Sequence, residues 1–97
     1  MESVSFDRDR LRDVCQRYGI ARLDVFGSTA RAEDTPQSDI DLLYVLAPDI
    51  HLGFEFFDIE VELSEIFGRP VDLVSRDHLH PALRERVFDE AWELYAA

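Results

Sequence analysis

The segment over residues 39–46 constrains the fold most, because the five residues that follow its second acid are all apolar. In an extended strand, successive side chains point to opposite faces. Apolar side chains therefore cover both faces here, Ile40, Leu42, Tyr44 and Leu46 on one side and Leu43 and Val45 on the other. A strand that is apolar on both faces is typical of the covered interior of a sheet. The sequence thus predicts a central strand with packed layers above and below it.

Periodicity and turn residues predict the other elements. We expect a helix over 7–18 ended by Gly19, a strand over 20–26, a short helix over 29–33 capped by Ser28, a long helix over 51–67 ended by Gly68, a strand over 71–75 and a helix over 81–90. In the last helix, Leu83, Val87 and Ala91 should point inward. Residues 92–95 either extend this helix or form a final edge strand.

The size of the chain predicts a single domain over 1–97, because 97 residues with 46% apolar content suffice for one hydrophobic core and not for two. No apolar run approaches the roughly 18 residues of a membrane span, and the start lacks a signal-peptide pattern. The single Cys15 agrees with a reducing compartment and with a role in packing. We therefore expect a soluble, cytoplasmic protein.

The charge balance disfavours autonomous nucleic-acid binding, because 21 acidic and 10 basic residues give a net charge of -11. All of the basic residues are Arg. The absence of Lys excludes a phosphate-loop Lys, a Schiff-base Lys and a Lys general base.

One group of residues has the spacing of a candidate catalytic site. It consists of Gly27-Ser28, then ten residues, then Asp39 and Asp41, and later Asp72. A turn at Gly27 with free backbone N–H groups after it suits a phosphate. Asp39 and Asp41, two residues apart on a strand, send both carboxylates to one face, which suits Mg²⁺. If the two strands are neighbours, Asp72 joins that face and completes a three-carboxylate site for two metal ions.

Other conspicuous residues have simpler interpretations. His51, His78 and His80 lack ligand spacing and are expected on loops. Trp92 and Tyr95 could anchor a partner, although core or edge packing is the simpler role. The acidic side chains between 55 and 65 are typical of a solvated helix face.

The pattern apolar-Gly-Ser, ten residues, Asp-apolar-Asp-apolar and then apolar-Asp-apolar resembles the DNA polymerase beta nucleotidyltransferase superfamily, and within it the minimal nucleotidyltransferases. The resemblance implies an α/β (α+β) fold with a small mixed sheet and helices mainly on one side. It also implies that Gly27, Ser28 and Arg31 contact the triphosphate, and that Asp39, Asp41 and Asp72 form the catalytic, metal-binding group, with Asp72 near the attacking hydroxyl.

Minimal members of this superfamily are commonly paired with a HEPN-domain toxin, and they transfer AMP from ATP to a Tyr of that toxin. The resemblance therefore implies a Mg²⁺-dependent antitoxin. Two alternatives stay open: an antitoxin that neutralises its partner by occupancy alone, and nucleotidyl transfer to a small molecule or an RNA 3′ end. The sequence leaves open the base specificity, the acceptor hydroxyl, the number of nucleotides added and the oligomeric state.

Overall fold

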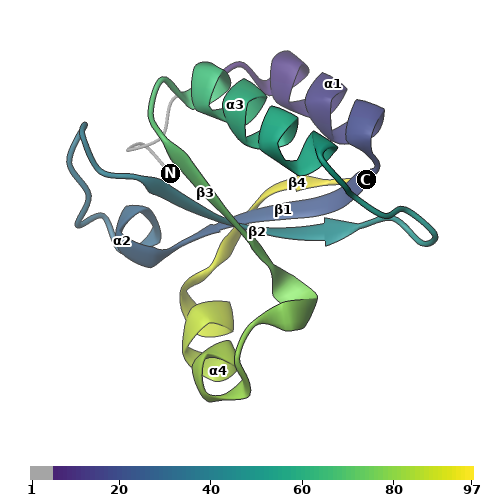
Figure 1. Cartoon of the computed structure of the whole chain (residues 1–97). Coiled ribbons are helices and arrows are strands. Elements are labelled where there is room, and N and C mark those ends of the chain that lie inside the picture. The colour runs from purple at the N-terminus through teal and green to yellow at the C-terminus, as the bar shows by residue number, and fades with distance from the viewer. Residues whose placement is uncertain (1–5) are drawn as a thin grey trace.

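The computed structural model describes residues 6–97, which form a four-stranded sheet flanked by helices (Figure 1). The elements in chain order are α1 (Arg8–Tyr18), β1 (Ile20–Phe26), α2 (Gly27–Ala30), β2 (Ile40–Leu46), α3 (Glu55–Phe67), β3 (Val71–Ser75), the 3₁₀ helix η1 (Arg76–His78), α4 (Pro81–Glu90) and β4 (Trp92–Ala96).

The sheet is mixed, with the strand order β3-β2-β1-β4. β1 runs antiparallel to both β2 and β4, whereas β2 and β3 are parallel. Parallel neighbours need a crossover connection, which α3 supplies. The expectation that β2 is an interior strand is confirmed.

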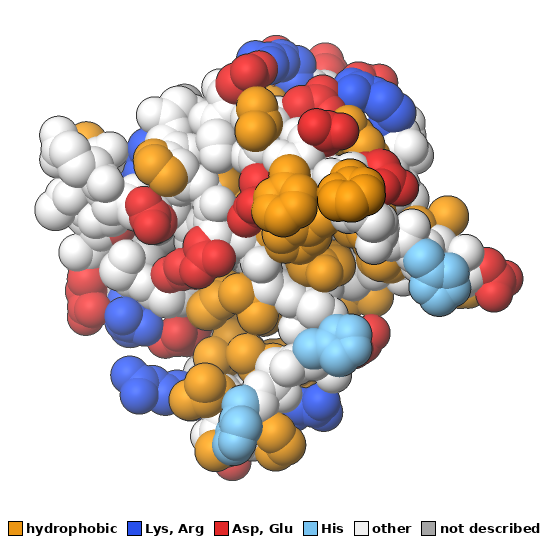
Figure 2. All heavy atoms as spheres, in the orientation of Figure 1, with side chains coloured by type: hydrophobic (Ala, Val, Ile, Leu, Met, Phe, Trp, Pro, Cys, Tyr) orange, Lys and Arg blue, Asp and Glu red, His pale blue; other side chains and the backbone are white. Residues whose placement is uncertain are grey.

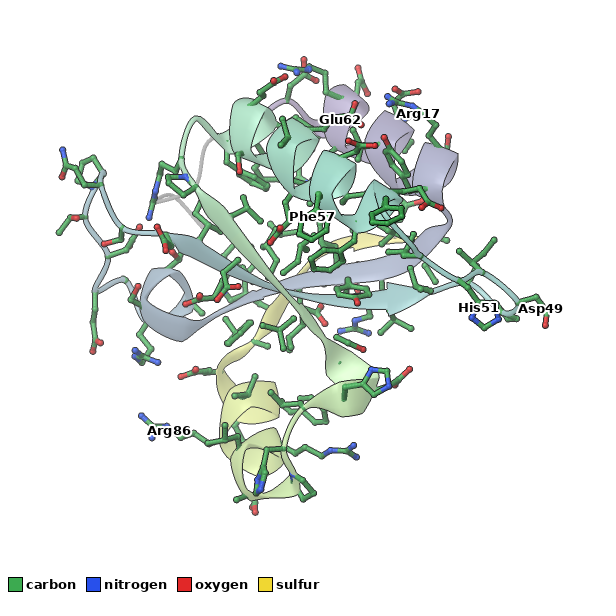
Figure 3. The ribbon with its side chains drawn as sticks, viewed as in Figure 1. Arg17, Asp49, His51, Phe57, Glu62 and Arg86 are labelled. Atoms are coloured by element: carbon green, nitrogen blue, oxygen red, sulfur yellow. The ribbon has the colours of Figure 1, made fainter. Side chains whose placement is uncertain are left out.

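One face of the sheet carries the main core, under α1 and α3. Leu23, Leu42, Ile59 and Leu63 are among its fully buried side chains. The two helices are joined at the surface by Glu62, which accepts hydrogen bonds from Arg17 Nη1 (2.8 Å) and the Tyr18 hydroxyl (2.7 Å). Figure 3 shows Arg17 and Glu62 side by side on top of the helix pair. This helix layer covers one side of the sheet.

The opposite face is covered by a smaller apolar cluster, in which Leu43 of β2 meets Leu79 and Val87. α4 packs against this face, but its Leu83 is 48% exposed, so the prediction that Leu83 points inward is wrong. Val87 is buried as expected, and Ala91 packs against the cluster. Asp72, on the same sheet face as Leu43, stays exposed. This face is therefore covered only in part.

Two elements have boundaries that differ from the sequence prediction by more than one residue, and the structure decides between the two alternatives for residues 92–95. The short helix begins at Gly27 and ends at Ala30, so Ser28 lies in its first turn and does not cap it. α3 begins at Glu55, because the chain bends at Gly53 before entering the helix. The tail resolves as an edge strand, since β4 pairs with β1. None of the helices within residues 6–97 is long and apolar enough to span a bilayer.

Candidate active site

Gly27 forms a tight turn between β1 and α2, with a φ of +72°. L residues with side chains rarely adopt this left-handed conformation. A Cβ at this position would also clash with the Oδ2 atom of Asp41. The backbone can therefore lie against that carboxylate only because the residue is glycine.

Asp41 and Asp72 lie directly opposite each other in the parallel pairing of β2 with β3. Asp41 is partly buried and Asp72 is exposed. Their neighbours Ile40 and Leu42 point into the main core, so both carboxylates project from the partly covered face. The structure thus brings together two of the three predicted carboxylates with the glycine turn. Asp39, the third, is exposed immediately before β2.

The ionisation of Asp41 depends on burial and on its charged neighbours. Burial raises the pKa of its carboxyl group, and the negative charges of Asp72 and Asp39 raise that pKa further. Arg31 opposes this rise. The site therefore carries negative charge that a bound cation would neutralise.

Arg31 is held beside the turn by two carboxylates. Its Nε donates to Glu33 Oε1 at 3.0 Å, and its Nη1 donates to Glu90 at 3.1 Å (Oε1) and 2.9 Å (Oε2). Glu90 Oε1 also accepts the backbone N–H of Gly27 at 3.2 Å. Glu90 could not be identified from the sequence, because a lone acid at the end of α4 has no spacing that links it to residues about sixty positions earlier.

A second missed residue, Arg69, fixes the loop between Ser28 and Asp39. Its Nη1 lies 2.9 Å from Asp34 Oδ2, and its Nε donates to the backbone carbonyl of Ser38 at 2.9 Å. Both charged side chains are largely buried. The loop that leads into Asp39 is therefore anchored to the turn before β3. In the sequence, the only indication of this role of Arg69 is its position as a charged residue between Gly68 and Pro70.

The three acidic side chains of the candidate site have the ligand chemistry that a hard cation requires. Asp41, Asp72 and Asp39 offer the carboxylate oxygens that Mg²⁺ prefers. Within residues 6–97, however, no three His, Cys, Asp or Glu side chains converge into a ready-made cation site. The pairing of Asp41 with Asp72 and the raised pKa of Asp41 both fit a bound cation, which would offset the charge of these acids.

The remaining sequence candidates lie elsewhere and have local roles. His80 accepts the backbone N–H of Ala82 and caps α4, and His78 pairs with Ser75. His51 lies on the loop before α3 (Figure 3). Trp92 and Tyr95 pack against the main core from β4, which agrees with their simpler interpretation.

Residues 8–92 match the family described as the nucleotidyltransferase domain. This match covers most of the chain, and it assigns the chain to a family of domains that transfer nucleotides. The chain belongs to the nucleotidyltransferase domain family, among its minimal members.

Two curated relatives carry a more specific name. A Methanocaldococcus jannaschii protein, with the provisional name protein adenylyltransferase, is 35% identical over 75 residues, which are 77% of this chain and 80% of the relative. Protein adenylyltransferase MntA of Thermococcus cleftensis is 32% identical over 79 residues, or 81% and 79% of the two chains.

Solved structures share the fold. One, provisionally described as a minimal nucleotidyltransferase, is 38% identical and superposes with a TM-score of 0.73 over 90% of this chain and 88% of its own. Another contains a tri-AMPylated HEPN toxin from Shewanella oneidensis in complex with its MNT antitoxin; it is 17% identical, with a TM-score of 0.64 over 93% and 70% of the chains. At 17% identity, the similarity to the Shewanella oneidensis complex shows a shared fold and nothing more.

Proposed function

We propose that this protein transfers AMP from ATP to a hydroxyl group, a Tyr of a cognate HEPN toxin, and thereby acts as an antitoxin in the cytoplasm. The observation that carries the proposal is the register of β2 and β3, which sets Asp41 opposite Asp72 beside the Gly27 turn. Paired carboxylates next to a glycine turn suit in-line phosphoryl displacement. Membership of the nucleotidyltransferase family supports this reading.

Each predicted site residue has a role in this scheme. Gly27, Ser28 and Arg31 would bind the triphosphate, and Asp39, Asp41 and Asp72 would hold two Mg²⁺ ions. Bound Mg²⁺ would neutralise charge on the phosphates and orient them.

The transfer step forms one bond and breaks one. The acceptor oxygen bonds to the α-phosphorus, the bond from that phosphorus to the bridging oxygen breaks, and pyrophosphate leaves. Asp72, exposed at the open face, takes the hydroxyl proton.

A protein acceptor fits the chain better than a nucleic acid, because a net charge of -11 repels a polyanion. The names of the two relatives and the AMPylated toxin in the Shewanella oneidensis complex point the same way. Addition of AMP to a Tyr introduces bulk and a negative charge, which would oppose the entry of RNA into a ribonuclease site.

An exposed apolar patch on α3 offers a surface for this partner. Phe54, Phe57 and Val61 are 89%, 63% and 58% exposed and share one side of the helix. Figure 2 shows apolar side chains gathered there with acidic groups around them, and Phe57 points outward in Figure 3. Large exposed apolar groups mark interaction sites. The acidic border fits a partner whose apolar recess is rimmed by Arg or Lys.

The proposal is tested with the cognate HEPN toxin. Incubation of the purified pair with ATP and Mg²⁺, followed by intact mass spectrometry of the toxin, should show added AMP, and mapping should place it on Tyr. The Asp39→Asn/Asp41→Asn variant should leave the toxin unmodified and active. A Phe54→Ser/Phe57→Ser variant should bind ATP normally but capture the toxin poorly.

A binding-only antitoxin is the second candidate, and the α3 patch favours it because neutralisation by occupancy needs only such a surface. The same experiment separates the two. If the Asp39→Asn/Asp41→Asn variant inhibits an unmodified toxin as well as the wild type does, the transfer proposal is wrong.

A further inference from the structure

Glu90, the last residue of α4, makes two contacts at the glycine turn with one carboxylate. It accepts the Gly27 N–H at 3.2 Å and binds Arg31 Nη1 through both oxygens, at 3.1 and 2.9 Å. Its side chain is 18% exposed, whereas the neighbouring Asp89 is exposed. This single group therefore ties the end of α4 to both the turn and the guanidinium.

We propose that Glu90 is a positioning residue for the nucleotide, which orients Arg31 and the Gly27 turn toward the phosphates of ATP. The inference rests on the proposed function, because it assumes that ATP binds at this turn. Glu90 itself need not touch the nucleotide.

The hydrogen bonds of Arg31 explain how this positioning would work. Glu33 holds Nε and Glu90 holds Nη1, so neither contact uses Nη2. A guanidinium fixed on two sides presents its remaining N–H groups in one direction, and less side-chain freedom is lost when a phosphate binds.

The alternative is that Glu90 obstructs the site as a negative charge that a phosphate must displace. The direct contact opposes this, because Arg31 Nη1 binds both carboxylate oxygens of Glu90 and offsets the negative charge of that group.

The test measures ATP binding in the presence of Mg²⁺ by calorimetry for five proteins: the wild type, Glu90→Ala, Arg31→Ala, the double variant and Asp89→Asn. We expect Glu90→Ala to weaken ATP binding about tenfold, the scale of one oriented charged contact. The loss of affinity in the double variant should be clearly smaller than the sum of the two single losses, because Glu90 acts largely through Arg31. Asp89→Asn changes the net charge next to Glu90 and should bind as the wild type does.

Glu90→Gln covers the case in which the alanine variant does not fold. Its amide oxygen can still accept the Gly27 N–H, but it loses the ion pair with Arg31, so it should melt near the wild type and bind ATP more weakly than Asp89→Asn. In steady-state assays, the loss should fall mainly on KM, with kcat little changed.

Tighter ATP binding in Glu90→Gln would overturn the inference in favour of obstruction. The inference would also be overturned if the affinity loss in the double variant equalled the sum of the losses in Glu90→Ala and Arg31→Ala. Such additivity would show that Glu90 affects the structure in general and does not act through Arg31. A folded wild type that binds no ATP would overturn the proposed function together with this inference, whereas equal binding by the wild type and both Glu90 variants would overturn this inference alone.

Discussion

The guanidinium of Arg69 lies 2.9 Å from the carboxylate of Asp34, and the two side chains are only 12% and 6% exposed. Removing one member of a buried ion pair leaves the other charge without a partner, which costs about 3 to 5 kcal/mol. We expect Arg69→Met to lower the free energy of unfolding by about that amount in urea titrations. Arg86→Met, on the exposed side of α4 (Figure 3), is the control and should change it by less than about 0.5 kcal/mol. Equal effects of the two substitutions would contradict a structural role for the pair.

Gly27 and Gly68 provide a matched pair of left-handed glycines, with φ values of +72° and +69°. Alanine at either position incurs the left-handed conformational cost, about 1 to 2 kcal/mol. Only at Gly27 does the new Cβ also meet the carboxylate of Asp41, since nothing lies within 4 Å at Gly68. We expect Gly27→Ala to be the more destabilising and to abolish transfer, whereas Gly68→Ala should keep full activity. Equal unfolding energies, measured in urea, would show that the close approach of Gly27 to Asp41 has no energetic consequence.

Asp41→Asn should separate activity from stability. The raised pKa of Asp41, caused by burial and by the nearby acids, means that its charge destabilises the folded state at neutral pH. Without metal, the variant should therefore be more stable than the wild type, by about 1 kcal/mol. On the proposed function, its transfer rate should fall by at least about 100-fold. Thermal melts in EDTA beside a transfer assay decide this, with Asp89→Asn as the charge-matched control. Near-normal transfer would remove Asp41 from the metal site.

Asp72 should act on the acceptor more than on ATP. It is the more exposed member of the pair with Asp41, as expected for a group that meets an incoming hydroxyl. Loss of a proton acceptor typically lowers the rate by about 10²- to 10⁴-fold. We expect Asp72→Asn to show this loss in kcat with a much smaller change in ATP affinity. An affinity loss with an unchanged kcat would place Asp72 at nucleotide binding.

The contact between α1 and α3 should give stability an acid-dependent component. The Tyr18 hydroxyl and Arg17 lower the pKa of Glu62 below its ordinary value of 4.5. A lowered carboxyl pKa stabilises the folded state fully above the ordinary value, and this stabilisation is lost as the pH falls through the folded-state pKa. Glu62→Gln should therefore flatten the acid side of the stability profile, measured by urea titration from neutral pH downward. Glu65→Gln, on the exposed side of the same helix, should leave that slope as it is in the wild type.

The sheet could be predicted from the sequence because alternation is a local signal. β1 and β3 begin and end where the pattern predicts, and β2 does so to within one residue. Helix starts were less accurate, since no apolar period distinguishes the bend at Gly53 from the first turn of α3. The prediction for Leu83 was wrong because α4 packs only a narrow side against the sheet. Helical spacing alone does not show how the helix is rotated about its axis.

The site could be predicted only where strand geometry governs it. Asp41 and Asp72 occupy the same place in two apolar patterns, so they share a face if the two strands are neighbours, as the structure shows them to be. The contacts of Glu90 with Gly27 and of Arg69 with Asp34 have no such pattern. They join segments that meet only after the chain has folded, and each depends on the path of a long side chain.

The alternation of β3 also protects the fold against mispairing. Val71 and Leu73 are buried against α3 while Asp72 faces away. Because side chains alternate with a period of two, a one-residue slip of β3 along β2 would turn Asp72 beneath α3 and expose both apolar neighbours. The slip would bury an unpaired carboxylate, which is strongly unfavourable. The acid proposed to serve the chemistry therefore also keeps an edge strand in its correct register during folding.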